Sequence, residues 1–142
     1  MKKSKRKFVL AGLVLLVSCI TAPEEAPLPQ LTTEQQRTEY LLSLGWEVEP
    51  EPLETLQFLL PTPLAEPYLT YNQLQLPQGF NLEDCCGKQI SRFTYAVTNY
   101  PGRSQGVQAN LYICEDLPVA GDICCPGEDG FQEPLIRDND AE

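Results

Sequence analysis

The chain contains no histidine. Histidine is the usual base beside a catalytic serine or cysteine, and it is the commonest metal ligand in proteins. Its absence excludes Ser-His and Cys-His catalytic pairs, although an enzyme that uses carboxylates or a lone thiol stays open. No constellation of catalytic residues stands out among the other residue types. We therefore expect no catalytic residues, no bound metal and no cofactor.

Basic residues are scarce beyond the first few positions. The chain has 10 Lys and Arg against 20 Asp and Glu, and five of the basic residues fall within residues 1–18. The remainder holds five basic residues against twenty acidic ones, a formal net charge of −15. Such a chain repels nucleic acids and anionic lipid headgroups. We expect no nucleic-acid partner and no membrane attachment through a basic surface.

A long apolar run is also missing. The greasiest stretch, Phe8 to Val17, follows a lysine-rich start and is much shorter than the about 20 apolar residues that span a bilayer. A basic start followed by a short apolar run is typical of a secretory signal, although an uncleaved signal anchor is the alternative. The run leads into Leu-Val-Ser-Cys, ending at Cys19, which resembles the bacterial lipobox. We predict a signal peptide over residues 1–18 and a lipid on Cys19.

A lipid on Cys19 would hold the protein on the outer side of the cell membrane. Two or three acyl chains anchor a protein stably, because each buried CH₂ contributes about 0.8 kcal/mol. The acidic, proline-rich residues 19–31 predict an extended tether. Residues 32–136 are enough for one domain with one core, and residues 137–142 form an acidic tail.

The periodicity of the domain predicts two helices and four strands. A capping box of Thr33 and Gln36 starts a helix over 34–44, and Pro67 opens a second helix that ends at Leu76. Alternating patterns predict strands at 53–60, 88–100, 107–113 and 117–124. We expect an α+β fold of order α-β-α-β-β-β, with both helices packed on one face of a roughly four-stranded antiparallel sheet. The second helix is expected to pack on that sheet where Tyr71, Phe93 and Tyr95 meet.

Five cysteines follow Cys19, and in an exported protein a disulfide is the first interpretation. The residues are Cys85, Cys86, Cys114, Cys124 and Cys125. A turn at residues 115–116 would place Cys114 and Cys124 more than about 20 Å apart, against a limit of about 7 Å between bridged Cα atoms. A bridge from Cys85 or Cys86 to Cys114 stays open.

Other uses of the thiols are weaker. Adjacent cysteines lack the two-residue spacing of zinc sites. The simplest interpretation makes Cys124 a small core residue and the other four surface or partly buried thiols, with a redox role as the alternative.

Four residues are candidates for ligand binding. Asn99 and Tyr100 stand at the end of a strand beside a Pro-Gly loop, and a tyrosine suits a binding face because it joins an apolar ring to a hydroxyl. Asp122 and Asp129, the latter with Glu128 among loop glycines, could offer oxygens to calcium. They lack the regular spacing of a calcium loop, so an ordinary acidic surface is the simpler interpretation.

Several segments resemble a known bacterial family. They are TEQQRTEYLLSLGW from Thr33, YNQLQLPQGFNL from Tyr71, FTYAVTNYPG from Phe93, and the later GDIC and DGF. In this order they resemble the "domain of unknown function 4830" family, found mainly in Firmicutes, over about residues 32–135. The resemblance implies a small exported or membrane-anchored protein, and it implies no particular activity.

The sequence departs from that family's pattern at several positions. Members tend to have Tyr-Arg where Cys85 and Cys86 stand, and they lack cysteines matching Cys114 and Cys125. They often have a histidine shortly after the Asp-Gly-Phe, and Pro77 replaces a helix-compatible residue. A role for that histidine would be absent from this chain.

Together these features favour a non-enzymatic binding or accessory domain of the cell envelope, with an unidentified protein or envelope partner. A carboxylate- or thiol-based enzyme is one alternative. A structural subunit of an envelope complex is the other.

Overall fold

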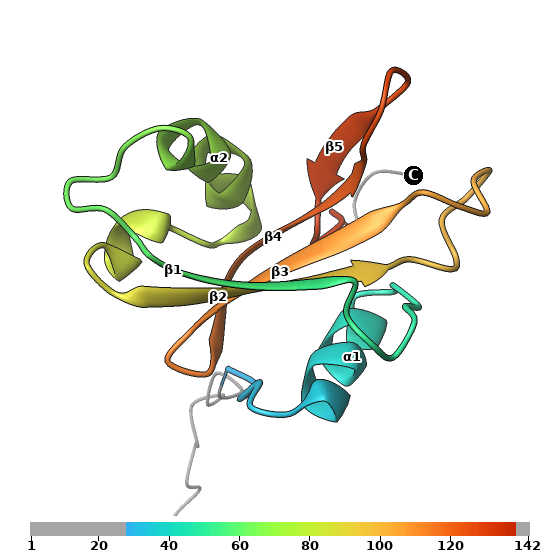
Figure 1. The fold of residues 1–142 in the computed structure, drawn as a ribbon, viewed down its shortest axis with the longest axis horizontal. Coiled ribbons are helices and arrows are strands. Elements are labelled where there is room, and N and C mark those ends of the chain that lie inside the picture. The colour runs from blue at the N-terminus through green and yellow to red at the C-terminus, as the bar shows by residue number, and fades with distance from the viewer. Residues whose placement is uncertain (1–27, 139–142) are drawn as a thin grey trace, which may run out of the picture.

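The computed structural model describes residues 28–138, which form two helices and one sheet (Figure 1). The helices are α1 (Glu34–Ser43) and α2 (Tyr68–Gln75). The strands are β1 (Glu54–Leu59), β2 (Gln89–Ala96), β3 (Gln108–Cys114), β4 (Leu117–Cys125) and β5 (Phe131–Pro134). The predicted α+β class and the order α-β-α-β-β-β are confirmed. A short fifth strand, which the sequence patterns did not predict, closes the order.

The five strands form one antiparallel sheet in the order β1-β2-β3-β4-β5. Strands that follow one another in the chain are therefore neighbours in the sheet. Helix α2 is inserted in the chain between β1 and β2, which still pair with each other. The turn between β3 and β4 falls at Glu115 and Asp116, whose positive φ angles of 51° and 65° are typical of a two-residue hairpin. This turn pairs Cys114 with Leu117 and places Cys124 opposite Gln108. The predicted separation of Cys114 from Cys124 is confirmed.

The two helices lie on opposite faces of the sheet, and the expectation of a single covered face is wrong (Figure 1). Neighbouring residues of a strand point to opposite faces. Tyr95 and Leu111 belong to a buried cluster with Leu41 of α1, whereas Tyr112 belongs to a second cluster with Tyr71 of α2. The polar residues between the apolar ones on β2 and β3 suggested a solvent-facing side, but α2 covers that side as well.

Each cluster has its own anchoring contacts. The α1-side cluster is centred on Trp46, Tyr95, Leu111, Ile123 and Leu135, all at most 1% exposed. The Trp46 indole nitrogen donates a hydrogen bond of 2.7 Å to the Leu135 carbonyl and so joins the end of α1 to the segment after β5. The α2-side cluster contains Leu60, Leu64, Leu82, Cys85, Ile90, Tyr112, Cys114 and Ala120. Tyr71 therefore packs where α2 meets the sheet, whereas Phe93 and Tyr95 pack against α1.

The ends of both helices follow the predicted signals. The Thr33 hydroxyl accepts from the Gln36 amide at 3.2 Å, and the Gln36 side chain accepts from the Thr33 amide at 3.0 Å, which completes the capping box. Helix α2 ends in a 3₁₀ turn, η1 (Leu76–Gln78), which contains Pro77. Gly79 follows with φ 87°, a conformation that glycine adopts without strain, and it ends the helical segment.

Two glutamines of the α2 region complete the sheet where β5 falls short. Strand β5 pairs with β4 from Asp122 onwards, so the backbone of Gly121 lies beyond the ladder. Gln75 accepts a hydrogen bond from the Gly121 amide at 2.9 Å. Gln78 donates to the Gly121 carbonyl at 3.2 Å and accepts from the Ile136 amide at 2.9 Å. The side chains thus replace the missing strand partners of buried backbone groups.

The chain enters the domain beside the β3–β4 turn (Figure 1). The Leu31 amide donates a 2.7 Å hydrogen bond to the Asp116 carbonyl, and the Leu31 side chain is buried in the α1-side cluster. A second short helix, η2 (Leu82–Cys85), precedes β2. Within residues 28–138, no helix is both long and apolar enough to cross a membrane.

Candidate functional site

The most concentrated set of buried polar side chains surrounds Asp122 on β4. The Asp122 side chain is almost fully buried, with 1% of its surface exposed. Tyr71 of α2 donates its hydroxyl hydrogen to one carboxylate oxygen, and Asn110 of β3 donates to the other at 3.3 Å. Asn110 in turn accepts from the Thr94 hydroxyl at 2.7 Å. The network therefore crosses three strands and ends on α2.

Burial controls the proton equilibria in this network. Burial raises the pKa of Asp122, and hydrogen bonds from Tyr71 and Asn110 offset part of that rise. Burial and the nearby Asp122 charge raise the pKa of Tyr71 well above its usual value. Tyr71 therefore keeps its proton and acts as a donor.

The surface above this network is a hollow of about 460 Å³ lined by Glu66, Thr70, Tyr71 and Gln132, among others. Tyr71 lines the hollow and donates its hydroxyl hydrogen to Asp122. The carboxylate is 1% exposed, so a molecule in the hollow would meet the tyrosine ring before the acid. Asp122 thus serves the packing of α2 on the sheet, whereas the sequence suggested an exposed acid or a candidate calcium ligand.

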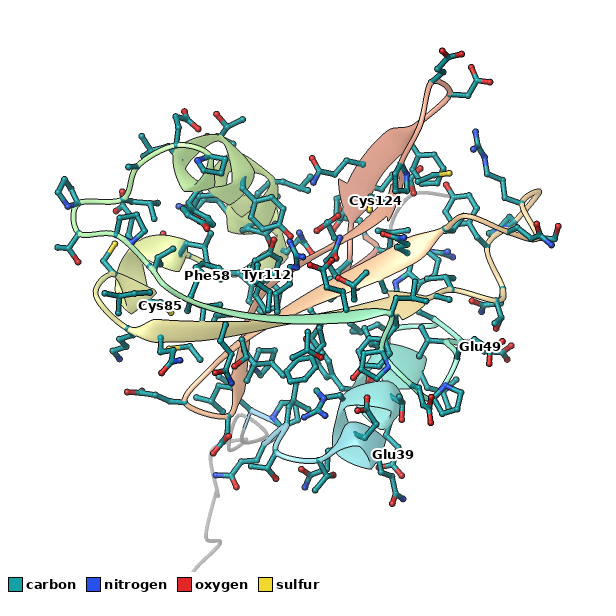
Figure 2. All side chains as sticks on the ribbon, in the orientation of Figure 1. Glu39, Glu49, Phe58, Cys85, Tyr112 and Cys124 are labelled. Atoms are coloured by element: carbon teal, nitrogen blue, oxygen red, sulfur yellow. The ribbon has the colours of Figure 1, made fainter. Side chains whose placement is uncertain are left out.

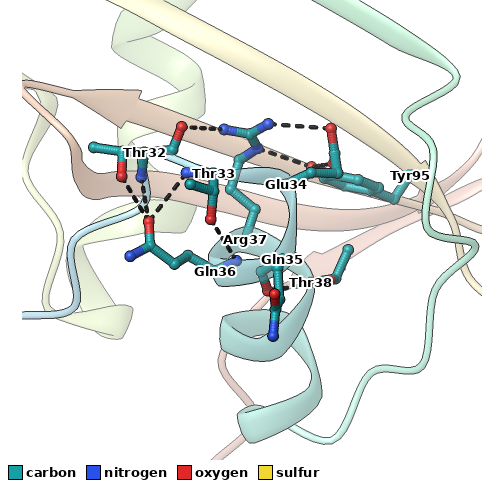
Figure 3. Close-up of polar contacts among 8 residues, drawn as sticks. All are labelled: Thr32, Thr33, Glu34, Gln35, Gln36, Arg37, Thr38 and Tyr95. Carbon is teal, nitrogen blue, oxygen red and sulfur yellow. Dashed lines mark hydrogen bonds and ion pairs between the residues drawn. The ribbon is translucent and has the colours of Figure 1, made fainter.

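A second polar set joins α1 to the opposite face of the sheet (Figure 3). Arg37 is 9% exposed, and its guanidinium lies 3.9 Å from the centre of the Phe93 ring. It donates to the Tyr95 hydroxyl at 3.0 Å and to Glu34 at 3.1 Å, while the Tyr95 hydroxyl donates to Glu34. All three polar groups have partners inside the set, so we assign this set to the attachment of α1.

The predicted ligand positions Asn99 and Tyr100 lie together but are engaged in internal contacts. Asn99 accepts from the Glu47 amide at 2.9 Å and donates to the Gly45 carbonyl at 2.9 Å, which fixes the segment after α1. The Tyr100 ring stacks with Trp46 and with Phe131, whose ring centres are 6.1 Å and 4.9 Å away. Its hydroxyl donates to Glu133 at 2.7 Å. This hydrogen bond is the main reason that the pKa of Tyr100 is raised, and burial is the second.

The other predicted positions fall elsewhere. Asp129 lies in the exposed loop before β5, where its carbonyl accepts from Arg103 at 3.1 Å. The same arginine donates to the Cys125 sulfur at 3.3 Å and lies 5.1 Å from the centre of the Phe131 ring. Asp122 is buried beneath α2, whereas Asp129 lies in the exposed loop before β5. The four candidates therefore do not form one site. The predicted lipidation residue, Cys19, lies outside the described residues.

The edge strand β1 carries the most exposed apolar surface near the sheet. Leu56 is 41% exposed and Leu59 is 68% exposed, and Leu53 just before the strand is 59% exposed. The prolines at its entrance had indicated an edge or an irregular segment. No feature of the sequence separated these leucines from core residues, because apolar residues in a short strand look alike whether or not they are covered.

In the structure no disulfide joins the five described cysteines, and the labelled Cys85 and Cys124 lie apart (Figure 2). Cys85 and Cys114 are buried in the α2-side cluster at one end of the sheet. Cys124 and Cys125 lie towards the other end and are partly exposed, so the expectation that Cys124 is the core cysteine is wrong. Residues 28–138 contain no group of three or more Cys, Asp or Glu side chains arranged to hold a metal ion.

Comparisons with known proteins add no relative. No family model matches the chain, and neither do the curated proteins or the solved structures. The resemblance to the "domain of unknown function 4830" family stays a prediction from the quoted segments.

Proposed function

We propose that this protein is an exported, lipid-anchored binding domain that pairs an extended segment of a partner protein with the edge of β1. The open edge of β1 carries this proposal. An extended peptide adds to a sheet edge through main-chain hydrogen bonds, and its side chains then fill alternate positions. The signal sequence and Cys19 supply the predicted location of the domain outside the membrane.

The strand register identifies the backbone groups that a partner would meet. Leu60 exchanges hydrogen bonds with the segment before β2, because its amide donates to the Lys88 carbonyl and its carbonyl accepts from Gly87, both at 2.9 Å. Residues of an antiparallel strand alternate between facing the partner and facing away. The amide and carbonyl groups of Thr55, Gln57 and Leu59 therefore point away from β2, out of the sheet edge.

The surroundings of the edge favour a basic partner. Glu47, Glu49, Glu51 and Glu54 are all exposed on the segment that leads into β1. Only Glu54 has a described ion pair, at 3.0 Å from Arg92 of the neighbouring strand. Charge complementarity speeds encounter and selects partners of opposite sign. We therefore assign the edge to an extended segment that combines lysine or arginine with apolar residues.

Photo-crosslinking in membranes tests the edge directly. A photoreactive residue replaces Gln57, whose side chain is exposed and whose amide points out of the sheet. We expect a discrete adduct with an envelope protein, and we expect the adduct to be lost in a chain that also carries Leu59→Lys. The control is Leu69→Lys, which places the same charge on an exposed leucine of α2.

A defined peptide gives the matching measurement on the purified full chain in detergent. A peptide of alternating lysine and valine should slow hydrogen exchange at Thr55, Gln57 and Leu59, and Gln57→Pro should remove this protection. Equal binding to the wild type and to Gln57→Pro, together with no adduct at position 57 in membranes, would contradict the proposal.

The anchor is tested separately from the binding edge. Mass spectrometry of the membrane form should find a chain that starts at a lipid-modified Cys19. Cys19→Ser should abolish the lipid and the cleavage. An intact Met1 in the membrane fraction would contradict the lipoprotein assignment and leave the edge proposal standing.

A further inference from the structure

Cys85 and Cys114 come from separate segments and meet in one buried cluster. Cys85 ends η2 and is 6% exposed, and Cys114 ends β3 and is 4% exposed. Both pack with Leu60, Ile90 and the other residues of the α2-side cluster. They are the only cysteines in the described chain that are buried.

The strand register places the two residues at the same end of the sheet. Ser91 pairs with Ile113, so the next position places Ile90 opposite Cys114. The Cys85 carbonyl accepts from the Lys88 amide at 3.0 Å, and this contact turns the chain from η2 into β2 beside Cys114. An ion pair of 3.3 Å between Lys88 and Glu115 holds the same two segments together at the surface.

The two thiols are close enough to interact. Burial is the main reason that the pKa of Cys85 rises to about 11, and the charge and hydrogen bond of Cys114 add to the rise. Such a thiol ionises poorly, so it reacts slowly with reagents from solution. Both thiols lie inside the same apolar cluster, away from solvent.

We propose that Cys85 and Cys114 are joined by a disulfide bond in the exported protein. That the bond forms outside the cytoplasm rests on the predicted export of the protein. The choice of Cys85 and Cys114 as partners rests on the fold alone. The two S–H bonds are replaced by one S–S bond, and two protons and two electrons leave. A disulfide donor, such as oxidised glutathione or an exported oxidoreductase, takes up both electrons and is released as two thiols.

The other cysteines do not compete for this bond. Cys124 lies opposite Gln108, six positions along β3 from Cys114, which corresponds to about 20 Å at the rise of a strand. Bridged Cα atoms are at most about 7 Å apart. Figure 2 places Cys85 and Cys124 towards opposite ends of the sheet. Cys86 adjoins Cys85, but it is partly exposed and only borders the cluster.

Differential alkylation of the full chain tests the bond. The protein is expressed with its own signal in a bacterial host, extracted with detergent at acidic pH, denatured, and alkylated before and after reduction. We expect Cys85 and Cys114 to react only after reduction and to appear in one cross-linked peptide pair. Cys86, Cys124 and Cys125 should react before reduction.

Neighbouring variants provide the control. Cys86→Ser should keep the cross-linked pair, whereas Cys85→Ser should make Cys114 reactive without reduction. The urea midpoint of the wild type should fall on reduction, and the midpoint of Cys85→Ser should not change. A bond from Cys86 to Cys114, or free Cys85 and Cys114 in the cellular sample, would overturn the proposal.

A glutathione arm identifies which premise failed. Purified, fully reduced protein is unfolded in urea, so that both thiols are exposed, and is refolded in detergent with oxidised glutathione. Formation of the Cys85–Cys114 bond there, but not in cells, would place the error in the exported location. Failure in both samples would place the error in the pairing itself.

Discussion

The hydroxyl of Tyr71 donates to the carboxylate of Asp122 and so fastens helix α2 to the centre of strand β4. The contact joins residues 51 positions apart in the sequence and is partly buried. It accounts for a charged residue at 1% exposure in a domain of this size.

Tyr71→Phe should destabilise the domain by about 1–3 kcal/mol, because the Asp122 oxygen loses its donor while remaining buried. Urea unfolding followed by circular dichroism measures the change. Tyr68→Phe is the matched control on the same helix, since its ring would still stack on Phe58 and the Asp122 contact would remain. Equal losses in the two variants would show that the Tyr71 hydroxyl has no special role.

Asp122 should make stability depend on pH in the direction opposite to that of a salt-bridged acid. Its folded pKa is raised above the ordinary value of 3.8, so the folded state binds the proton more tightly than the unfolded state. The stability that comes from protonated Asp122 is fully present below the pKa of this carboxyl in the unfolded chain. It is lost as pH rises through the pKa of the carboxyl in the folded chain.

The difference in unfolding free energy between the wild type and Asp122→Asn isolates this effect. The unfolding free energy of the wild type should fall relative to that of Asp122→Asn as pH rises from below 3.8 through the raised pKa. Asp129→Asn, in an exposed loop, corrects for the removal of one negative charge. A difference that stays flat with pH would show that burial does not shift Asp122.

Arg37→Met should cost about 1–3 kcal/mol, because it keeps the apolar stem but removes the donors to Tyr95 and Glu34. The Tyr95 hydroxyl would keep one partner, which limits the loss. Arg103→Met removes a more exposed arginine that also lies near an aromatic ring, and it should cost less than about 1 kcal/mol. Thermal unfolding of both variants gives the comparison.

Gln75→Leu should destabilise the sheet by about 1–3 kcal/mol, because the buried Gly121 amide loses its acceptor. Hydrogen exchange at Gly121 should also become faster. Gln73→Leu makes the same change on the exposed side of α2 and should leave that exchange rate unaltered. Unchanged exchange in both variants would mean that β4 is satisfied without Gln75.

Local signals were the part of the fold that could be predicted. The capping box at Thr33 and Gln36 and the hairpin at Glu115 and Asp116 depend on a few adjacent residues, and both are confirmed. Strand β5 was missed because it is four residues long, ends in a proline and follows a glycine-rich loop. Four residues are too few to show an alternating pattern of apolar and polar residues. The strand forms because the outer edge of β4 has backbone groups available for pairing.

The placement of the helices could not be read from alternation alone. Thr94, Asn110 and Asp122 occupy the polar positions of their strands, which usually face solvent. Thr94 and Asp122 are buried and Asn110 is half-buried, because their polar groups bond to one another and to Tyr71. A polar residue in a strand thus indicates solvent or a hydrogen-bonding partner, and only the tertiary structure separates these cases. The same limit explains why Asp122 suggested a ligand site.

The hydrogen bond from Leu31 to Asp116 determines how the domain would bear a mechanical load. A pull on the chain before Leu31 reaches the β3–β4 turn through this hydrogen bond and is then carried along β3 and β4. The ladders that join this hairpin to β2 and β5 are then loaded in shear, so their hydrogen bonds share the force and do not open one at a time. If Cys19 carries the predicted lipid, a force on that anchor would therefore release Leu31 before the sheet gives way.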